Sequence, residues 1–255
     1  MDAIKLRTSR VGPIAAVAVA SLLVGATAAR ATTLYSNDFE GASTTDLTGA
    51  TTILDAPNSS THFLGPLSTD NGTGSVTLTL NTAGYSSITL TFDVYAIMTL
   101  DGDGPAGGNS PSNPDAFIVG VAGGPTLEDY SFANYSADTQ NYPGSQGPAT
   151  PGEAPQTGAS AVNTLGYGNS GDATYTFSYT FTPTAGGMTM ITFTGQDNQD
   201  TGDEFFGLDN LQVTGVPNTT GGVPEPASWA FMLAGLGLAG AGLRTRRRLV
   251  AANPR

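Results

Sequence analysis

The chain has 255 residues, no cysteine, one histidine and a formal net charge of −12 at pH 7. The lack of cysteine excludes disulfides, thiolate catalysis and cysteine-bound metals. The strong negative charge makes nucleic acid and anionic membrane surfaces poor partners for the acidic part of the chain.

The two signs of charge occupy different parts of the chain. None of the nine Lys and Arg residues lies between Ala31 and Gly222, whereas nineteen of the 21 acidic residues do, all but Asp2 and Glu225. Two carboxylates about 4 Å apart repel by roughly 1 kcal/mol in water and about 4 kcal/mol at an intermediate dielectric. Acidic clusters in this span must therefore be spread out, protonated or bridged by a metal. An acidic surface that keeps a secreted protein soluble explains the same charge equally well.

The N-terminus has the layout of a secretory signal peptide. Basic residues within the first ten positions precede an apolar run of 14 residues, Val11 to Val24. Two Ala-x-Ala patterns follow and end at Ala28 and Ala31, as a cleavage site requires. We predict that residues 1–31 are a signal peptide, cut after Ala28 or Ala31. A retained N-terminal anchor is the alternative.

The next part of the chain, residues 32–214, predicts a single all-β domain. Apolar residues alternate with Thr-rich positions over 76–80, 88–100 and 175–181, and a shorter apolar run covers 116–121. This period of two is typical of half-buried antiparallel strands, which predicts an antiparallel β-sandwich. We expect residues 34–39 and 205–213 to be the first and last strands and to lie side by side. Residues 215–222 predict a flexible linker.

A first acidic cluster follows the longest predicted strand, at Asp101, Asp103 and Asp115. Oxygen ligands on a Gly-rich loop suit Ca²⁺, although Pro105 and Ser112 break the EF-hand pattern. An acidic turn at the end of a strand is the alternative interpretation.

A second acidic cluster lies near the end of the domain and contains Asp197, Asp200, Asp203, Glu204 and Asp209. Asp209 has apolar neighbours in a strand-like segment, where an acid is unfavourable unless it is paired or bound to metal. We predict Asp203, Glu204 and Asp209 as ligands of a second Ca²⁺ ion.

Catalysis has little support in the sequence. His62 is the single histidine, which excludes multi-histidine zinc sites, and no nucleophile motif lies near it. Paired carboxylates can hydrolyse glycosides, but residues 31–222 contain no Lys, Arg or Trp to accompany them. We therefore expect no enzyme activity. Stacking of sugars on Tyr130, Tyr135, Tyr142 or Tyr167 is compatible with the sequence, as is ordinary packing of these rings.

The C-terminus contains an uncharged apolar segment of 17 residues, Ala227 to Leu243, that ends in a cluster of arginines. As a helix this segment spans about 25 Å, slightly less than the roughly 30 Å of a bilayer core. We predict that it forms a single transmembrane helix. The arginines predict a cytoplasmic end, so residues 249–255 would be a cytoplasmic tail. A buried hairpin helix of a soluble domain is the alternative.

This tail resembles the PEP-CTERM sorting signal of Gram-negative bacteria. The residues that carry the resemblance are Val223, Pro224, Glu225 and Pro226, followed after the apolar segment by Arg244, Arg246, Arg247 and Arg248. The resemblance covers about residues 222–248, and we assign residues 223–248 to the sorting signal. It implies a membrane-anchored precursor, cleavage near the Pro-Glu-Pro sequence by an exosortase, and delivery to the cell surface or an exopolysaccharide matrix.

The end of the domain is also similar to β-rich domains that often precede such tails. Glu204, Gly207, Leu208, Asp209 and Asn210 follow the order typical of those domains, whereas Phe206 stands where Trp is commoner. The resemblance implies a jelly-roll-like sandwich related in shape to carbohydrate-binding modules, sometimes with structural Ca²⁺. We therefore expect a structural or adhesive protein with carbohydrate and Ca²⁺ as ligands. A secreted polysaccharide-degrading enzyme that uses paired carboxylates is the alternative.

Overall fold

The computed structural model describes residues 30–49, 52–58, 60–69, 72–104, 108–110, 112–147, 152–218 and 226–251. The predicted signal peptide lies outside these residues except for Arg30 and Ala31, and so do Val223, Pro224 and Glu225. Residues Ala29–Thr220 form one compact unit, and the C-terminal helix belongs to another.

The larger unit consists of two antiparallel β-sheets. The first, sheet A, has the order β3-β4-β12-β6-β10-β9, with β1 also paired to β12. Its strands are β1 (Thr32–Asn37), β3 (Ile53–Asp55), β4 (His62–Leu64), β6 (Tyr85–Met98), β9 (Ala161–Val162), β10 (Asp172–Phe181) and β12 (Glu204–Pro217). The second, sheet B, has the order β2-β5-β11-β7-β8. Its strands are β2 (Leu47–Gly49), β5 (Thr73–Asn81), β7 (Ala116–Val121), β8 (Thr126–Ser131) and β11 (Met188–Gln196).

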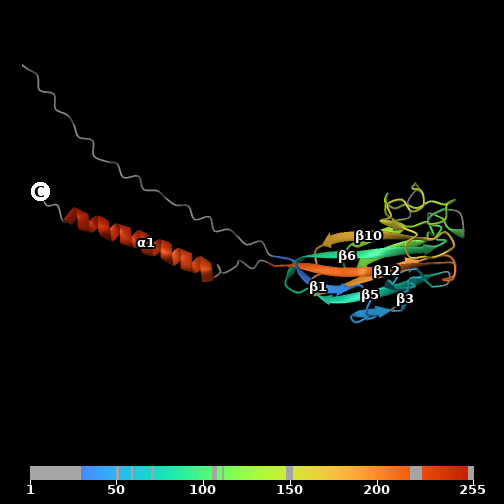
Figure 1. Cartoon of the computed structure of the whole chain (residues 1–255), viewed down its shortest axis with the longest axis horizontal. Helices are drawn as coiled ribbons and strands as arrows, with labels where there is room; N and C mark the ends of the chain where they lie inside the picture. Colours follow the sequence, from blue (N-terminus) through green and yellow to red (C-terminus); the bar gives the residue numbers. More distant parts are fainter. Residues whose placement is uncertain are drawn as a thin grey trace, which may run out of the picture. The chain divides into compact units, whose positions relative to one another are not determined.

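This architecture confirms the prediction of an all-β protein built from antiparallel strands. The long strands β10, β6 and β12 lie side by side in sheet A (Figure 1). The first strand pairs with the last as expected, from Thr32 opposite Gly215 to Asn37 opposite Leu211. β12 continues to Pro217, three residues beyond the predicted end of the domain at residue 214.

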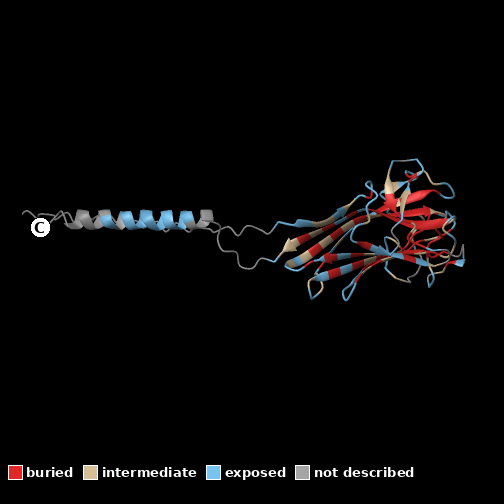
Figure 2. Ribbon diagram, turned by 90° about the horizontal axis from the view of Figure 1, so that it is seen from below, coloured by how far each residue is buried: buried red, intermediate tan, exposed pale blue. Residues whose placement is uncertain are grey.

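The core lies between the two sheets and follows the alternation seen in the sequence. In β5 and β10 buried and more exposed residues alternate, and this striping is visible along the strands in Figure 2. Phe92 of sheet A meets Phe193 of sheet B at a ring-centroid distance of 5.3 Å in an edge-to-face contact. Such pairs add about 0.5–1.5 kcal/mol to the apolar area that they bury.

A second, smaller apolar cluster lies on the opposite face of sheet A. It contains Phe63, Tyr95, Ile97, Leu165 and Phe205, all at most 5% exposed. Tyr95 and Ile97 alternate along β6 with Val94 and Ala96 of the main core, so they point away from it. The outer face of sheet A is therefore covered near the end of β6.

The C-terminal helix α1 (Pro226–Ala251) begins at a proline, which is well tolerated in a first helical turn. Its described apolar side chains Phe231, Leu233, Leu236 and Leu238 are 66–76% exposed. Among the described residues, no helix combines the length and the apolarity needed to cross a membrane.

Candidate metal centre

Four strand ends meet at one end of the sandwich and bring acidic residues from both predicted clusters together. Asp115 directly precedes β7, and Asp197 directly follows β11. Because Gln196 pairs with Ala116, these two acids emerge next to each other. Glu204 begins β12 and pairs with Met98 of β6. Met98 lies three residues before Asp101 in the chain. The two predicted clusters therefore contribute to a single site.

Asp101, Asp115 and Glu204 form the centre of this site. Each offers a carboxylate oxygen, and these oxygens all lie within 4.8 Å of one another. The residues are only 3%, 0% and 0% exposed, respectively. Burial of three carboxyl groups at this spacing is strongly unfavourable in the ionised form without a counter-charge.

Hydrogen bonds fix two of the three carboxylates in place. The Asp101 N–H donates to Asp115 Oδ2 at 2.7 Å, and the Asn198 N–H donates to Asp115 Oδ1 at 3.2 Å. Gln199 Nε2 donates to Asp101 Oδ2 at 2.8 Å. Both carboxylate oxygens of Glu204 are buried without a hydrogen-bond partner among the described residues. Packing and the main chain of Glu204, rather than hydrogen bonds to its carboxylate, thus hold this side chain among the described residues.

Burial and mutual repulsion shift the protonation of all three groups. Burial, together with repulsion from the neighbouring acids, raises the pKa of Glu204 to about 10. The pKa values of Asp101 and Asp115 both rise to about 7, again chiefly through burial. In Asp115 the N–H of Asp101 opposes this rise. Without a cation, the centre holds protons at neutral pH.

Further acids surround the centre. Asp197 is 1% exposed and lies close enough to Asp115 and Glu204 to raise the pKa values of both. Asp138 is 4% exposed and acts on Asp101 in the same way. Asp103, predicted as a ligand, instead accepts a hydrogen bond from Thr139 Oγ1 at 3.0 Å. Its second oxygen is buried without a hydrogen-bond partner among the described residues.

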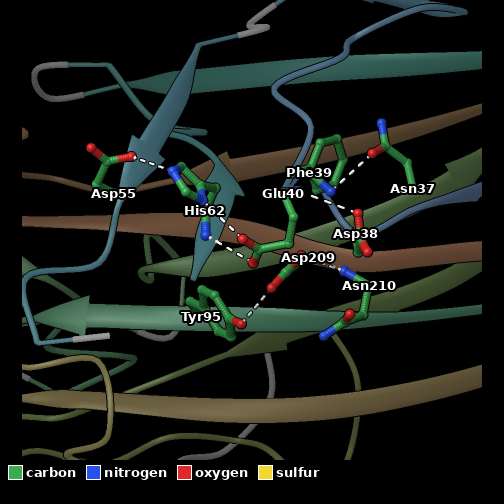
Figure 3. A network of polar contacts seen from close by, with 9 residues as sticks. All are labelled: Asn37, Asp38, Phe39, Glu40, Asp55, His62, Tyr95, Asp209 and Asn210. Carbon is green, nitrogen blue, oxygen red and sulfur yellow. Dashed lines mark hydrogen bonds and ion pairs between the residues drawn. The ribbon is translucent and has the colours of Figure 1, made fainter. Parts of the chain in front are cut away.

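Two predicted ligands remain, Asp203 and Asp209. Asp203 lies close enough to Asp101 and Glu204 to raise the pKa values of both. The main-chain oxygen of Asp203 accepts hydrogen bonds from the main chain and side chain of Thr99. Asp209 belongs to a separate network on sheet A, where Tyr95 Oη donates to its Oδ2 at 2.7 Å (Figure 3). The Asn210 N–H donates to its Oδ1 at 2.7 Å. Asp209 therefore does not join Glu204 in the centre.

His62 lies between two acids and is drawn in Figure 3 together with Tyr95 and Asp209. His62 Nδ1 lies 2.8 Å from Glu40 Oε2, and His62 Nε2 lies 3.1 Å from Asp55 Oδ1 (Figure 3). The hydrogen bond to Glu40 raises the pKa of His62, and Asp55 contributes in the same direction. This arrangement stabilises an imidazolium ion and leaves neither ring nitrogen available as a base.

The sequence did not single out Glu128, which is completely buried in β8. Its Oε2 lies 3.5 Å from Tyr179 Oη, and its Oε1 has no hydrogen-bond partner among the described residues. Burial raises its pKa well above the ordinary value. The register of β8 shifts between Val119 and Gly120 of its partner strand, so simple alternation could not predict which side chains point inward.

Most of the tyrosines considered for sugar stacking pack against other rings. Tyr130 and Tyr142 meet edge to face at 5.0 Å, and Tyr167 contacts Phe205 at 5.7 Å. Tyr135 differs, with 40% of its surface exposed.

The structure thus defines a two-sheet β-sandwich with a buried acidic centre, followed by a helical C-terminal segment. Comparison with known families shows that this segment carries the PEP-CTERM protein-sorting motif, which matches residues 222–248. The predicted sorting signal is confirmed, and the motif is consistent with an exosortase substrate whose precursor is exported and membrane-anchored.

No curated protein matches the chain. Among solved structures, an exo-beta-1,3-galactanase from Phanerochaete chrysosporium, determined with beta-1,3-galactotriose, is similar at 16% identity and a TM-score of 0.29. The aligned region covers 71% of this chain and 29% of the galactanase chain. This similarity is too low to support an argument about function.

Proposed function

We propose that the β-sandwich is a non-catalytic module exported to the surface or extracellular matrix of a Gram-negative bacterium. The observation that carries this proposal is the PEP-CTERM motif at residues 222–248. The charge distribution supports it, since the sandwich is acidic and all Lys and Arg residues lie outside residues 31–222. A domain of this kind has no electrostatic attraction to nucleic acid or to anionic lipid.

The tail serves in this proposal as a temporary membrane anchor. The signal peptide starts export, and the exosortase then cuts near Pro224, Glu225 and Pro226. Exposed apolar side chains of α1, such as Phe231 and Leu238, support a segment that needs apolar surroundings until cleavage. The arginines from Arg244 to Arg248 would remain on the cytoplasmic side.

The work of the exported sandwich is structural or adhesive, with exopolysaccharide as the proposed partner. Hydroxyl groups lie along both sheets, as in the hydrogen bonds Thr89–Thr180 and Thr77–Thr192 at 3.0 Å. Such uncharged polar surfaces suit contact with sugar hydroxyls. Tyr135 offers a partly exposed ring for stacking on a sugar face.

The alternative, hydrolysis of polysaccharide by paired carboxylates, is less well supported by the geometry. A glycosidase needs two carboxyl groups that flank a bound sugar. Asp101, Asp115 and Glu204 are at most 3% exposed, so a sugar chain has no access to them. Binding is therefore the better proposal.

Intact-mass measurement on protein recovered from a host that contains an exosortase tests the export proposal. The mature protein should end near Pro224 to Pro226, and Glu225→Ala should leave an uncleaved, membrane-bound precursor. Mature protein that still carries Arg246 to Arg248 would contradict the temporary anchor.

A glycan array combined with a reducing-end assay tests the work of the sandwich. Binding without release of reducing ends supports an adhesive module, and Tyr135→Ala should then weaken binding. Release of reducing ends would support the enzyme, and a lack of both would leave a structural role alone.

A further inference from the structure

The most unusual group in the described residues is Glu204. Its side chain is 0% exposed, and neither carboxylate oxygen has a hydrogen-bond partner among those residues. Most buried polar groups are hydrogen-bonded, and an exception in a folded protein calls for an explanation. Here one of its carboxylate oxygens lies within 4.8 Å of a carboxylate oxygen from each of two more buried acids, Asp101 and Asp115. The side chain that lacks a partner therefore points into a site that already carries negative charge.

Residues 31–222 contain no Lys or Arg that could neutralise this site. The single histidine, His62, is bonded to Glu40 and Asp55 instead. Any counter-charge for Glu204 must therefore come from protons or from a bound ion.

We propose that Asp101, Asp115 and Glu204 bind one Ca²⁺ ion. All donors are carboxylate oxygens, which hard cations prefer, whereas zinc sites favour nitrogen and sulfur ligands. Ligand oxygens at about 2.3–2.6 Å from Ca²⁺ lie up to roughly 5 Å apart across the ion. The observed limit of 4.8 Å between the carboxylate oxygens fits that spacing. Mg²⁺ demands a tighter octahedral shell at about 2.0–2.1 Å and dehydrates reluctantly, which suits this buried site less well.

The existing hydrogen bonds position a ligand carboxylate without using all of its lone pairs. The N–H groups of Asp101 and Asn198 hold Asp115 in place, and each oxygen keeps a lone pair for a metal. Asp197, buried at the same strand ends, adds negative charge that strengthens the attraction. Bound Ca²⁺ would connect the segment after β6, the start of β7 and the start of β12. The site is thus one shared centre rather than two separate ones, and it is independent of the proposed sugar binding and of tail cleavage.

Calorimetric titration of the full chain with CaCl₂, after removal of metal with EDTA, tests this assignment. We expect one Ca²⁺ per chain and a much weaker response to MgCl₂. Thermal unfolding should shift upward as Ca²⁺ is added, since a ligand at 100 times its Kd raises the folded-to-unfolded ratio about 100-fold. No heat and no shift with CaCl₂, two ions per chain, or equal binding of Mg²⁺ would each overturn the proposal.

Two matched variants identify the ligand. Glu204→Gln keeps the shape of the side chain but removes one ligand charge, and we expect Ca²⁺ affinity to fall at least about tenfold. The same variant should be about as stable as wild type in EDTA, because no bound ion is lost and the amide keeps the shape of the side chain. Glu128→Gln is the control, since Glu128 is equally buried but lies in β8 away from the centre. Unchanged Ca²⁺ affinity in Glu204→Gln, or an equal loss in Glu128→Gln, would show that Glu204 is not a ligand.

Discussion

Glu204 and Asp209 are five residues apart on the same strand, and they illustrate two ways to bury a carboxylate. Asp209 is 2% exposed and accepts hydrogen bonds from the Tyr95 hydroxyl and the Asn210 main chain. Glu204 is 0% exposed and has no such partner among the described residues. The first group is satisfied by the protein, whereas the second is a ligand of the proposed Ca²⁺ ion.

The local backbone explains part of this difference. The pairing of β12 with β6 shifts between Asp209 and Gln212, and Asn210 there has a φ of 50°. Asn tolerates this left-handed conformation better than most residues do. The bulge allows the Asn210 N–H to turn back onto Asp209. Glu204 starts a regular ladder with β6 that has no bulge before Asp209.

The largest expected difference between the two kinds of acid lies in how the stability of the metal-free chain depends on pH. Burial and repulsion raise the pKa values of Asp101 and Asp115 from 3.8 to about 7, and that of Glu204 from 4.5 to about 10. The folded state therefore keeps protons that the unfolded state releases. The stability they contribute is complete below about pH 4 and is lost as pH rises through about 7 and toward 10.

Urea unfolding from pH 5 to 9 in EDTA should show this loss as a falling midpoint. Glu204→Gln should make the fall less steep, although Asp209 and Glu128 also have raised pKa values and act in the same direction. CaCl₂ should counteract the fall, because the ion replaces the protons. A midpoint in EDTA that rises with pH would contradict the burial of uncompensated acids.

A smaller effect is expected at the satisfied carboxylate. Asp209→Ala leaves the Tyr95 hydroxyl, on a side chain 5% exposed, without its acceptor. An unsatisfied buried donor costs about 1–3 kcal/mol of unfolding free energy. Denaturant titration with and without CaCl₂ should give the same loss, because Asp209 lies outside the proposed ion site.

The partner variant provides the control for this second prediction. Tyr95→Phe removes the donor, so the double variant with Asp209→Ala should lose less stability than the two single losses added together. Strict additivity would indicate that the hydrogen bond in Figure 3 contributes nothing measurable.

The strands could be predicted from the sequence because their pattern is local. Alternation in residues 76–80 and 175–181 matches β5 and β10, in which buried residues alternate with more exposed ones. The pairing of the first and last strands was also foreseen and is confirmed. Alternation could not predict which side chains of β8 point inward, because the register shift in this strand depends on its pairing with β7.

The acidic residues of the centre were recognised, but their grouping was not. Asp101 and Glu204 are 103 positions apart in the chain. They meet only because β12 starts opposite the end of β6, a register that hydrophobic alternation does not specify. The one available signal was that Asp115, Asp197 and Glu204 each stand at the border of an apolar run. Acids at strand ends are brought together when those strands are neighbours.

The smallest effect is expected at the exposed His62. Glu40 and Asp55 raise its pKa above the ordinary 6.5, so the folded state favours the imidazolium. The stability gained from this raised pKa is present below about pH 6.5 and is lost as pH rises through the folded-state value. Solvent screening keeps the gain small.

The single histidine makes this prediction directly measurable, because its ring protons give one set of NMR signals. We expect a titration midpoint above 6.5 in wild type and a lower midpoint in Glu40→Gln. Asp209→Asn should leave the midpoint almost unchanged, since Asp209 bonds to Tyr95 and Asn210 rather than to His62. A wild-type midpoint at or below 6.5 would mean that the two contacts in Figure 3 do not persist in solution. Glu40 would then join Glu204 as an acid without a counter-charge from residues 31–222.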